Sequence, residues 1–181
     1  MSLVGKSVTL RPVQVEDFQK IVEWTNYPEI QSYCEGDYPT SLEECDDWHR
    51  RSRSNRYQER FAISFKNNII GDIELDQITW RSGDAELRIR IGEQALWDRG
   101  LGTDAITCLL VHAFMHMNLN RIYLKVYVDN LRAIRCYQKV GFRKEGRLRR
   151  NNPEVAFREI ILMRVLKREF LRRQNILESV G

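Results

Sequence analysis

The hydrophobic positions between residues 84 and 91 alternate with charged ones, which is the pattern of a strand buried on one side. The aliphatic residues, from Ala85 to Ile91, would face the interior, and the Glu and Arg residues between them would face solvent. A different spacing follows at residues 106–117, where apolar side chains recur at offsets 0, 3, 4, 7, 8 and 11. This second pattern predicts a long amphipathic helix.

Other periodic segments extend the pattern along the chain. Strands are expected at residues 8–12, 60–66, 69–75, 121–128, 142–148 and 157–166, and helices at 16–25, 41–48, 130–140 and 167–178. A capping box of Ser41 and Glu44 marks the start of the second helix. Strands that alternate with helices after a hairpin predict an α/β class, with a mixed α+β sheet in one layer and helices packed on it.

Length and composition place the chain among ordinary globular proteins. At roughly 150 residues per domain, 181 residues predict a single domain over residues 1–181. The 43% of hydrophobic and 30% of charged residues exclude collagen-like and disordered chains, and no apolar run reaches the roughly 18 residues of a membrane span. The four cysteines form no close pair, so we expect reduced thiols in a soluble, cytoplasmic protein without membrane contact.

Charge is distributed unevenly along the sequence. Residues 1–120 carry 13 Lys and Arg against 19 Asp and Glu, whereas residues 121–181 carry 16 against 6. The acidic excess is densest at residues 21–49, which hold eight carboxylates and no Lys or Arg. This asymmetry predicts that the two halves meet ligands of different charge, and a solvated helix face is the alternative explanation of the acidic run.

The loop from Trp97 to Thr103 joins a predicted strand to the central helix. Gly100 and Gly102 allow a ligand to approach the backbone, and the first amides of a helix are free donors in a positive field. A phosphate would fit this site, and a turn required only by chain geometry is the alternative. With Ala105, the glycines also match a dinucleotide-binding pattern, but no carboxylate follows at the spacing that a ribose requires.

A second motif lies about thirty residues further along the chain. Asn130, Ala133, Tyr137, Gly141 and Phe142, at this spacing after a Gly-x-Gly helix start, resemble the GNAT superfamily of acetyl-CoA-dependent N-acetyltransferases. Three further features are similar to its RimJ/RimL branch: Leu10–Val13, Trp97 and Glu145–Arg147. The layout also resembles, more weakly, the bacterial spermidine acetyltransferases of the same branch.

The resemblance covers residues 8–170 and implies a GNAT-like fold, with a central, mostly antiparallel sheet that is flanked by helices and splayed at the cofactor site. Residues 1–60 would form the acceptor side, residues 61–142 the core with the cofactor loop, and residues 143–181 the C-terminal strands and a basic helix.

The cofactor implied by the resemblance is acetyl-CoA. Its pantetheine arm would bind the backbone of Ile89 and Ile91, and Asn130 would touch it. Its pyrophosphate would bind the backbone amides of the loop: Arg99, Gly100, Leu101, Gly102 and Thr103.

Acetyl transfer by direct attack needs a neutral amine nitrogen and a proton for the leaving thiolate. An alkylammonium has a pKa of about 10.4, so a base must take its proton, and Glu86 beside the expected thioester is our candidate. An ion pair with Arg88 or Arg90 on a solvated face is the alternative role of Glu86. The resemblance implies that the phenol of Tyr137 protonates the thiolate, whereas its place in an apolar helical stripe also fits a core residue.

The acceptor is either a protein N-terminal amine, as the RimJ/RimL likeness implies, or a small polyamine, as the acidic run suggests. In the second case Glu35 and Glu86 would contact the amine. A non-catalytic CoA-binding or ribosome-associated module is the rival from another class, because the basic C-terminal half would also suit a ribosome. A homodimer is a further expectation from the family. No metal site is predicted, since His112 and His116 lack both the glutamate of the zinc-protease pattern and a third ligand.

Overall fold

The computed structural model describes residues 1–34, 36–152 and 155–175. Its strands are β1 (Leu3–Val4), β2 (Val8–Arg11), β3 (Glu59–Phe65), β4 (Asn68–Thr79), β5 (Asp84–Ile91), β6 (Arg121–Tyr127), β7 (Arg143–Asn152) and β8 (Val155–Leu166). Its α-helices are α1 (Phe18–Thr25), α2 (Pro28–Gln31), α3 (Leu42–Ser54), α4 (Leu101–Met115), α5 (Leu131–Val140) and α6 (Lys167–Arg173). None of these helices, within the described residues, is long and apolar enough to cross a membrane.

Every strand and helix expected from the periodicity is present, with ends that differ by a few residues, and the end expected for the last helix, at residue 178, lies outside the described residues. The short elements β1 and α2 are additional. The start of α3 also differs from expectation, because the N-cap residue Ser41 makes no side-chain capping bond. Instead, the Glu44 carboxylate accepts the backbone N–H of Thr40 at 2.8 Å. Only the glutamate half of the predicted capping box is therefore formed, and it binds Thr40, the residue before the N-cap.

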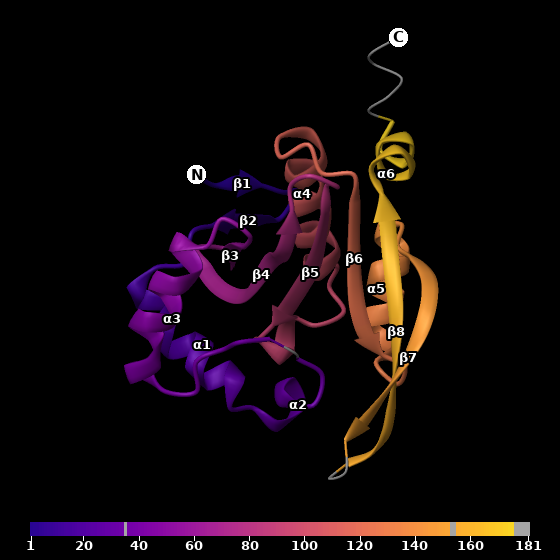
Figure 1. The fold of residues 1–181 in the computed structure, drawn as a ribbon. Coiled ribbons are helices and arrows are strands. Elements are labelled where there is room, and N and C mark those ends of the chain that lie inside the picture. Colours follow the sequence, from indigo (N-terminus) through magenta and orange to yellow (C-terminus); the bar gives the residue numbers. More distant parts are fainter. Residues whose placement is uncertain (35, 153–154, 176–181) are drawn as a thin grey trace.

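The eight strands form one sheet in the order β1-β2-β3-β4-β5-β6-β8-β7. All neighbours are antiparallel except β5 and β6, which run parallel and pair over only three residues, from Asp84 to Glu86 on β5. Beyond Glu86 the two strands diverge (Figure 1), so the end of β5 has an unpaired edge. This confirms the predicted sheet, mostly antiparallel and splayed, and puts the splay beside the loop that follows β5.

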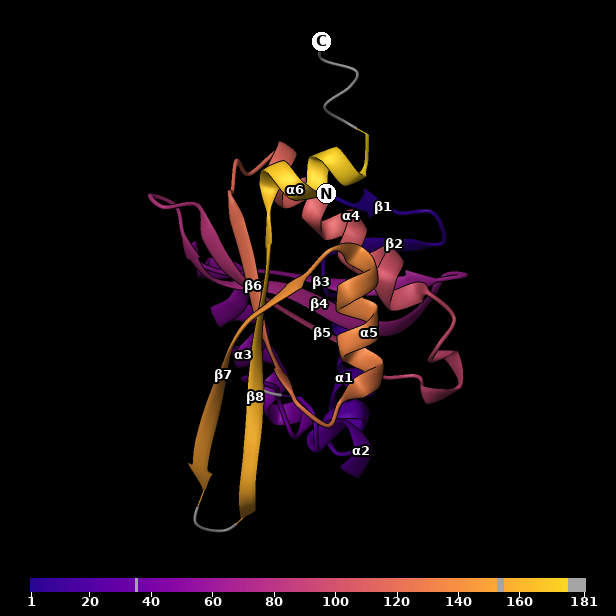
Figure 2. The same cartoon turned by 90° about the vertical axis from the view of Figure 1, so that its right-hand side faces the viewer.

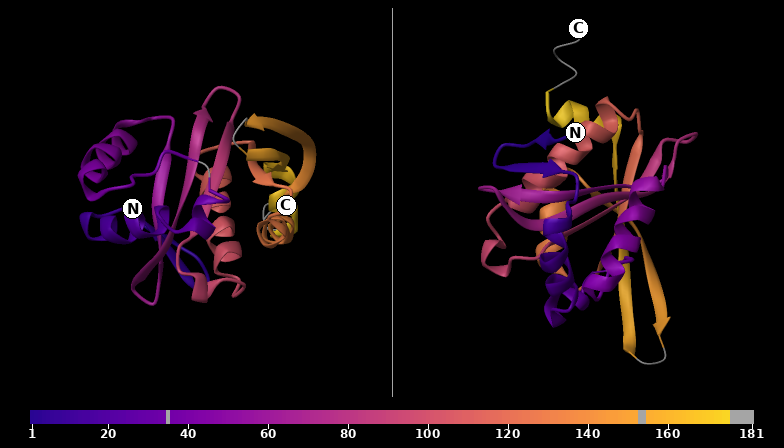
Figure 3. Two further views of the ribbon diagram at one scale, coloured as in Figure 1. Left: turned by 90° about the horizontal axis from the view of Figure 1, so that it is seen from below. Right: turned by 90° about the vertical axis from the view of Figure 1, so that its left-hand side faces the viewer.

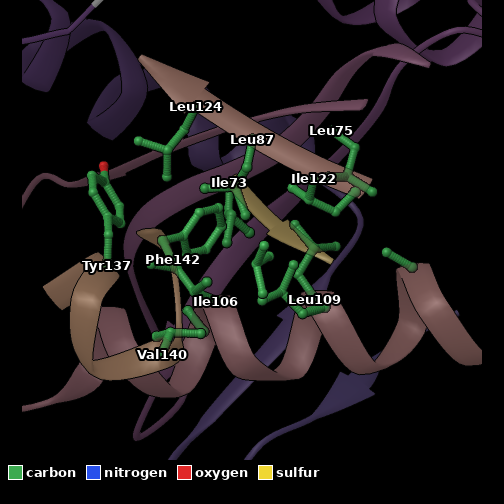
Figure 4. Packing of buried hydrophobic residues seen from close by; sticks show 14 of the residues in the cluster. Ile73, Leu75, Leu87, Ile106, Leu109, Ile122, Leu124, Tyr137, Val140 and Phe142 are labelled. Carbon is green, nitrogen blue, oxygen red and sulfur yellow. The ribbon is translucent and has the colours of Figure 1, made fainter. Parts of the chain in front are cut away.

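Helices cover both faces of the central strands. On one face, Ile73 of β4 and Leu87 of β5 pack in a common apolar cluster with Ile106 and Leu109 of α4 (Figure 4). On the other face, α1 and α3 contribute to a second cluster that contains Trp24. Figure 3 shows that these N-terminal helices and α4 lie on opposite sides of the strands.

This second layer shows that the predicted solvated side of β5 was wrong. Glu86 and Arg90 are only 3% and 4% exposed, and Arg88 is partly buried. Arg90 donates to Thr25 Oγ1 of α1 at 2.9 Å, and its guanidinium carbon lies 3.7 Å from the ring centroid of Tyr38. The alternating charges therefore face a covering layer of helix and loop, not water.

Strands β7 and β8 form a long hairpin that projects beyond the rest of the sheet, with α5 packed beside it (Figure 2). The outer strand, β7, carries Arg147 and Arg149, which are 66% and 77% exposed. Both lie 3.4 Å from Glu159 of β8. Two exposed arginines at this edge of the sheet thus share one carboxylate.

Candidate active site

The loop after β5 presents free backbone amides at the start of α4. Gly100 is the N-cap residue with a φ of +77°, a left-handed conformation that glycine adopts without strain. The amides of Leu101, Gly102 and Thr103 follow in the first turn, where the helix offers no acceptor for them. A Cβ on Gly102 would meet its nearest atom, Cys136 Sγ, at 3.7 Å, so packing alone does not require glycine here. These features fit a phosphate group that approaches the backbone closely.

A cleft of about 450 Å³ runs from this loop between the end of β5 and α5. Apolar side chains of Ile89, Ile91 and Ile106 line part of it. Its basic residues outnumber its acidic ones by five to two: Arg90, Lys125, Arg132, Arg135 and Lys139 against Glu29 and Asp98. The residues present therefore fit CoA, which combines phosphates with a long, largely uncharged pantetheine arm.

The backbone of Ile89 and Ile91 faces the splay, as the predicted pantetheine contacts require. The N–H of Gly92 donates to the carbonyl of Ile70 on β4, so the alternation of an antiparallel ladder turns Ile91 and Ile89 away from β4. The Ile91 carbonyl, however, already accepts the indole N–H of Trp97 at 2.8 Å. This leaves the Ile91 N–H and both backbone groups of Ile89 for a cofactor.

Two of the predicted cofactor residues have restricted roles. Arg99 is exposed and, unlike Gly100 and Thr103, does not line the cleft, so its contact with a phosphate stays a prediction. Asn130 lines the cleft, but it is also the N-cap of α5, where its side chain accepts the N–H of Ala133 at 3.3 Å. Its local role is therefore to start the helix that carries Tyr137.

Tyr137 lies on α5 where the cofactor cleft meets a second pocket, and its side chain lines both. In Figure 4 its hydroxyl points away from the apolar cluster around Val140 and Phe142. Burial raises the pKa of the phenol well above its usual value, and the neighbouring Cys136 and Cys34 add to the effect. The hydroxyl therefore keeps its proton at neutral pH, which a proton donor to a thiolate requires.

Glu86 is buried within the sheet. Arg88 and Gln77 each donate an N–H to its Oε2 at 3.3 Å, and no described residue makes a hydrogen bond to its Oε1. The ion pair that the sequence offered as an alternative thus exists with Arg88, although it is not solvated. Arg88 lies closer to Asp76, at 2.6 Å. Glu86 therefore shares a guanidinium that another carboxylate holds more tightly.

The second pocket, which we call the tyrosine pocket, is lined by Glu86 together with Tyr33, Tyr127, Tyr137 and Lys125. Aromatic rings and a carboxylate are groups that attract an alkylammonium. Lys125 on β6 adds one positive charge to the wall, and it forms no ion pair within the described residues. The pocket is thus aromatic and mixed in charge.

Beside the tyrosine pocket, three ion pairs stabilise the face shared by β4 and β5, and two of them are buried. Each pair has an N–O distance of 2.6 Å: Arg60–Glu74, Arg88–Asp76 and Arg90–Asp72. Burial raises the pKa of Glu74, and the charge of Arg60 opposes this shift. With Glu86 added, four carboxylates face three guanidiniums, so this group of residues carries one excess negative charge.

The acidic run at residues 21–49 does not contribute to the tyrosine pocket as expected. Glu35 lies outside the described residues, and no described member of the run lines that pocket. Glu29 lines the cofactor cleft instead. On α3, Asp47 lies 3.3 Å from Arg51, so part of the run is an ion-paired helix face. The simpler explanation of these charges therefore accounts for part of the run.

Sequence reasoning missed most of the residues that line the tyrosine pocket. Lys125 and Tyr127 alternate with buried Leu124 and Val126 on β6, so the argument used for β5 could have found them. Tyr33 follows α2 in a segment without periodicity, and no signal in the sequence marks it.

Comparison with known proteins places these features in a wider context. Residues 7–143 match the family model described as acetyltransferase (GNAT) domain. The uncharacterized N-acetyltransferase p20 of Bacillus licheniformis is 26% identical over 175 residues, which cover 93% of this chain and 98% of that relative. The spermidine N(1)-acetyltransferase of Vibrio cholerae serotype O1 is 29% identical over 146 residues, which cover 80% of this chain and 84% of that relative.

A solved structure agrees over a similar range. The crystal structure of spermidine N-acetyltransferase from Vibrio cholerae in complex with CoA and spermine superimposes with a TM-score of 0.82 and 27% sequence identity. The match covers 91% of this chain and 98% of that one.

Proposed function

Because this chain belongs to the GNAT acetyltransferase family, we propose that it transfers the acetyl group of acetyl-CoA to a primary amine of a polyamine such as spermidine. N-acetyl transfer from acetyl-CoA is the activity of the family, and the polyamine is the part that we propose. The proposal is supported by the relatives, of which one is a spermidine N(1)-acetyltransferase and another was solved with CoA and spermine.

The observation that carries the proposal is the position of Glu86. Glu86 and Tyr137 both line the tyrosine pocket, and Tyr137 also borders the cofactor cleft. An ammonium in this pocket would meet the faces of the tyrosine rings and a carboxylate whose Oε1 accepts no hydrogen bond from a described residue. The neighbouring ion pairs balance three carboxylates with three guanidiniums, so the excess negative charge that would attract the ammonium is that of Glu86 itself.

In the reaction, acetyl-CoA supplies the acetyl group as a thioester. We infer that Glu86 takes the proton of the bound ammonium, directly or through water, so that the nitrogen lone pair can attack the acetyl carbon. Tyr137 then donates its proton to the sulfur as the carbon–sulfur bond breaks. The acetylated nitrogen loses its remaining extra proton to the resulting phenolate, directly or through water, and the proton on Glu86 passes to solvent. The products are the N-acetylated amine and the free thiol, and no covalent bond to the protein forms.

The competing acceptor is a protein N-terminal amine, which the RimJ/RimL likeness implies. Neither the relatives nor the solved structure reported above is described as an enzyme of that kind or as a ribosome-associated protein. Homodimer formation likewise stays a prediction for this chain. The acceptor test below therefore includes a peptide.

The proposal is tested by measuring free thiol released from acetyl-CoA with spermidine, spermine or a peptide with a free N-terminus. We expect a kcat/KM at least about tenfold higher for a polyamine than for the peptide, which is a difference of about 1.4 kcal/mol in activation free energy. Equal values for all acceptors, or no thiol release with any of them, would contradict the proposed function.

A pair of variants then tests the role of Glu86. E86Q should lower kcat with spermidine by about 10²-fold or more, because the base is lost. E145Q is the matched control, since Glu145 pairs with Arg121 and is 42% exposed on β7, outside both pockets. Full activity of E86Q in a folded protein would remove Glu86 from the mechanism.

A further inference from the structure

Two residues far apart in the sequence meet at the cofactor cleft. The indole Nε1 of Trp97 donates to the carbonyl of Ile91, the last residue of β5, at 2.8 Å. The guanidinium carbon of Arg132, in the first turn of α5, lies 3.5 Å from the ring centroid of the same indole. We call these two residues the Trp97–Arg132 clasp. The clasp connects the end of β5 with the start of α5, which are opposite walls of the cleft.

Arg132 occupies a position that is unfavourable for a cation. The dipole of α5 places partial positive charge at its first turn, and no acidic residue lies in that turn. Within the part of the chain that the structure describes, no carboxylate forms an ion pair with Arg132. Among the described residues, the contact that its guanidinium makes is with the indole face of Trp97. Helix stability therefore does not explain the arginine, whereas a bound anion would.

We propose that Arg132 binds a phosphate group of CoA and that Trp97 is the positioning residue that holds Arg132 in place. Stacking engages the face of the guanidinium and leaves its in-plane N–H donors available to phosphate oxygens. Trp97 is itself held by its bond to Ile91, so the guanidinium has a fixed support. The cofactor phosphates would then meet a charged side chain in addition to the backbone amides at Gly100–Thr103. This contact does not depend on which amine accepts the acetyl group.

The test measures CoA binding to the purified protein by calorimetry, without any acceptor. R132Q should weaken binding by about tenfold or more, the size expected for lost hydrogen bonds to a charged group. R50Q is the control for net charge, because Arg50 is 76% exposed on α3 and does not line the cleft. The salt dependence of binding should be smaller in R132Q than in wild type or R50Q.

The role of Trp97 is separated by a double-mutant cycle. W97L should weaken CoA binding by about threefold or more, and W97L/R132Q should bind no more weakly than R132Q alone, since the support matters only through the arginine. W97F retains an aromatic face and should stay within about threefold of wild type. Melting temperatures identify any variant that fails to fold. If W97L does not fold, R132Q and W97F still test the proposal, because both make smaller changes.

Two outcomes would overturn the proposal. The first is CoA binding by folded R132Q within about twofold of wild type, or with an unchanged salt dependence. The second is additive losses in W97L and R132Q, which would limit Trp97 to packing. Repeating the titrations with 3′-dephospho-CoA assigns the phosphate: a penalty that persists in R132Q places Arg132 on the pyrophosphate, and one that disappears places it on the 3′-phosphate.

Discussion

Replacing Tyr137 with Phe would remove one hydroxyl and keep the buried ring. The side chain is 9% exposed and packs 5.9 Å, between ring centroids, from Phe142. Since the hydroxyl makes no hydrogen bond to another described residue, Y137F should change the free energy of unfolding by about 1 kcal/mol or less. Any larger effect on catalysis would then belong to the hydroxyl itself.

The magnitude of that effect follows from the environment of the phenol. A general acid contributes about 10²- to 10⁴-fold to a rate. Burial raises the pKa of Tyr137 well above its usual value, which keeps the proton in place but makes the phenol a weaker acid than a thiol of pKa about 8.5. We therefore expect the lower end of the range, a loss of about 10²-fold in kcat, which corresponds to about 2.7 kcal/mol in activation free energy.

The assay is steady-state release of free thiol from acetyl-CoA at saturating spermidine, combined with calorimetry of CoA binding. Y137F should lose kcat with a CoA affinity within about twofold of wild type. Because the pKa is raised, wild-type kcat should not fall between about pH 7 and 9.5 through deprotonation of this phenol. Y57F, at a 50% exposed tyrosine, is the matched control. A folded Y137F with kcat within about threefold of wild type would show that Tyr137 is not the acid.

Three further perturbations test other parts of the structure. Asp104 of α4 accepts the backbone N–H groups of Lys6, Ser7 and Val8, at the turn between β1 and β2, at 2.7 to 2.9 Å. D104A should therefore lower the free energy of unfolding, measured in urea, by about 2 kcal/mol. An unchanged free energy of unfolding would show that this turn does not need the carboxylate. K125Q removes a positive charge from the tyrosine pocket, so the KM for spermidine should fall by about threefold or more, and a rise would speak against a cationic acceptor. Burial raises the pKa values of Cys34 and Cys108 to about 11, which leaves little reactive thiolate at pH 8. Iodoacetamide should therefore label both thiols on the order of 10²-fold more slowly than free cysteine, as followed by mass spectrometry. Fast labelling of Cys34 would show that its thiol is not buried in this way.

The positions of the elements could be read from local patterns. Residues 84–91 form β5 with the predicted ends, and the glycine loop starts α4 as expected, because backbone geometry imposes a period of two on strands and free amides on helix starts. Tyr137 and Gly100 were found through motif spacing, and both border the cleft. Periodicity and helix starts concern residues close in the sequence, whereas Tyr137 was found through a family resemblance whose motifs lie about thirty residues apart.

Periodicity shows which side chains share a face, but not what covers that face. The charged face of β5 reads as solvated, yet Arg90 is buried against α1 and paired with Asp72, which lies 18 positions earlier in the sequence. Similarly, Trp97 and Arg132 meet only because β5 and β6 stop pairing after Glu86 and leave the cleft between β5 and α5. Contacts of this kind depend on how distant strands pair and which helices pack on them, so the three-dimensional arrangement alone decided the burial of Glu86 and the composition of both pockets.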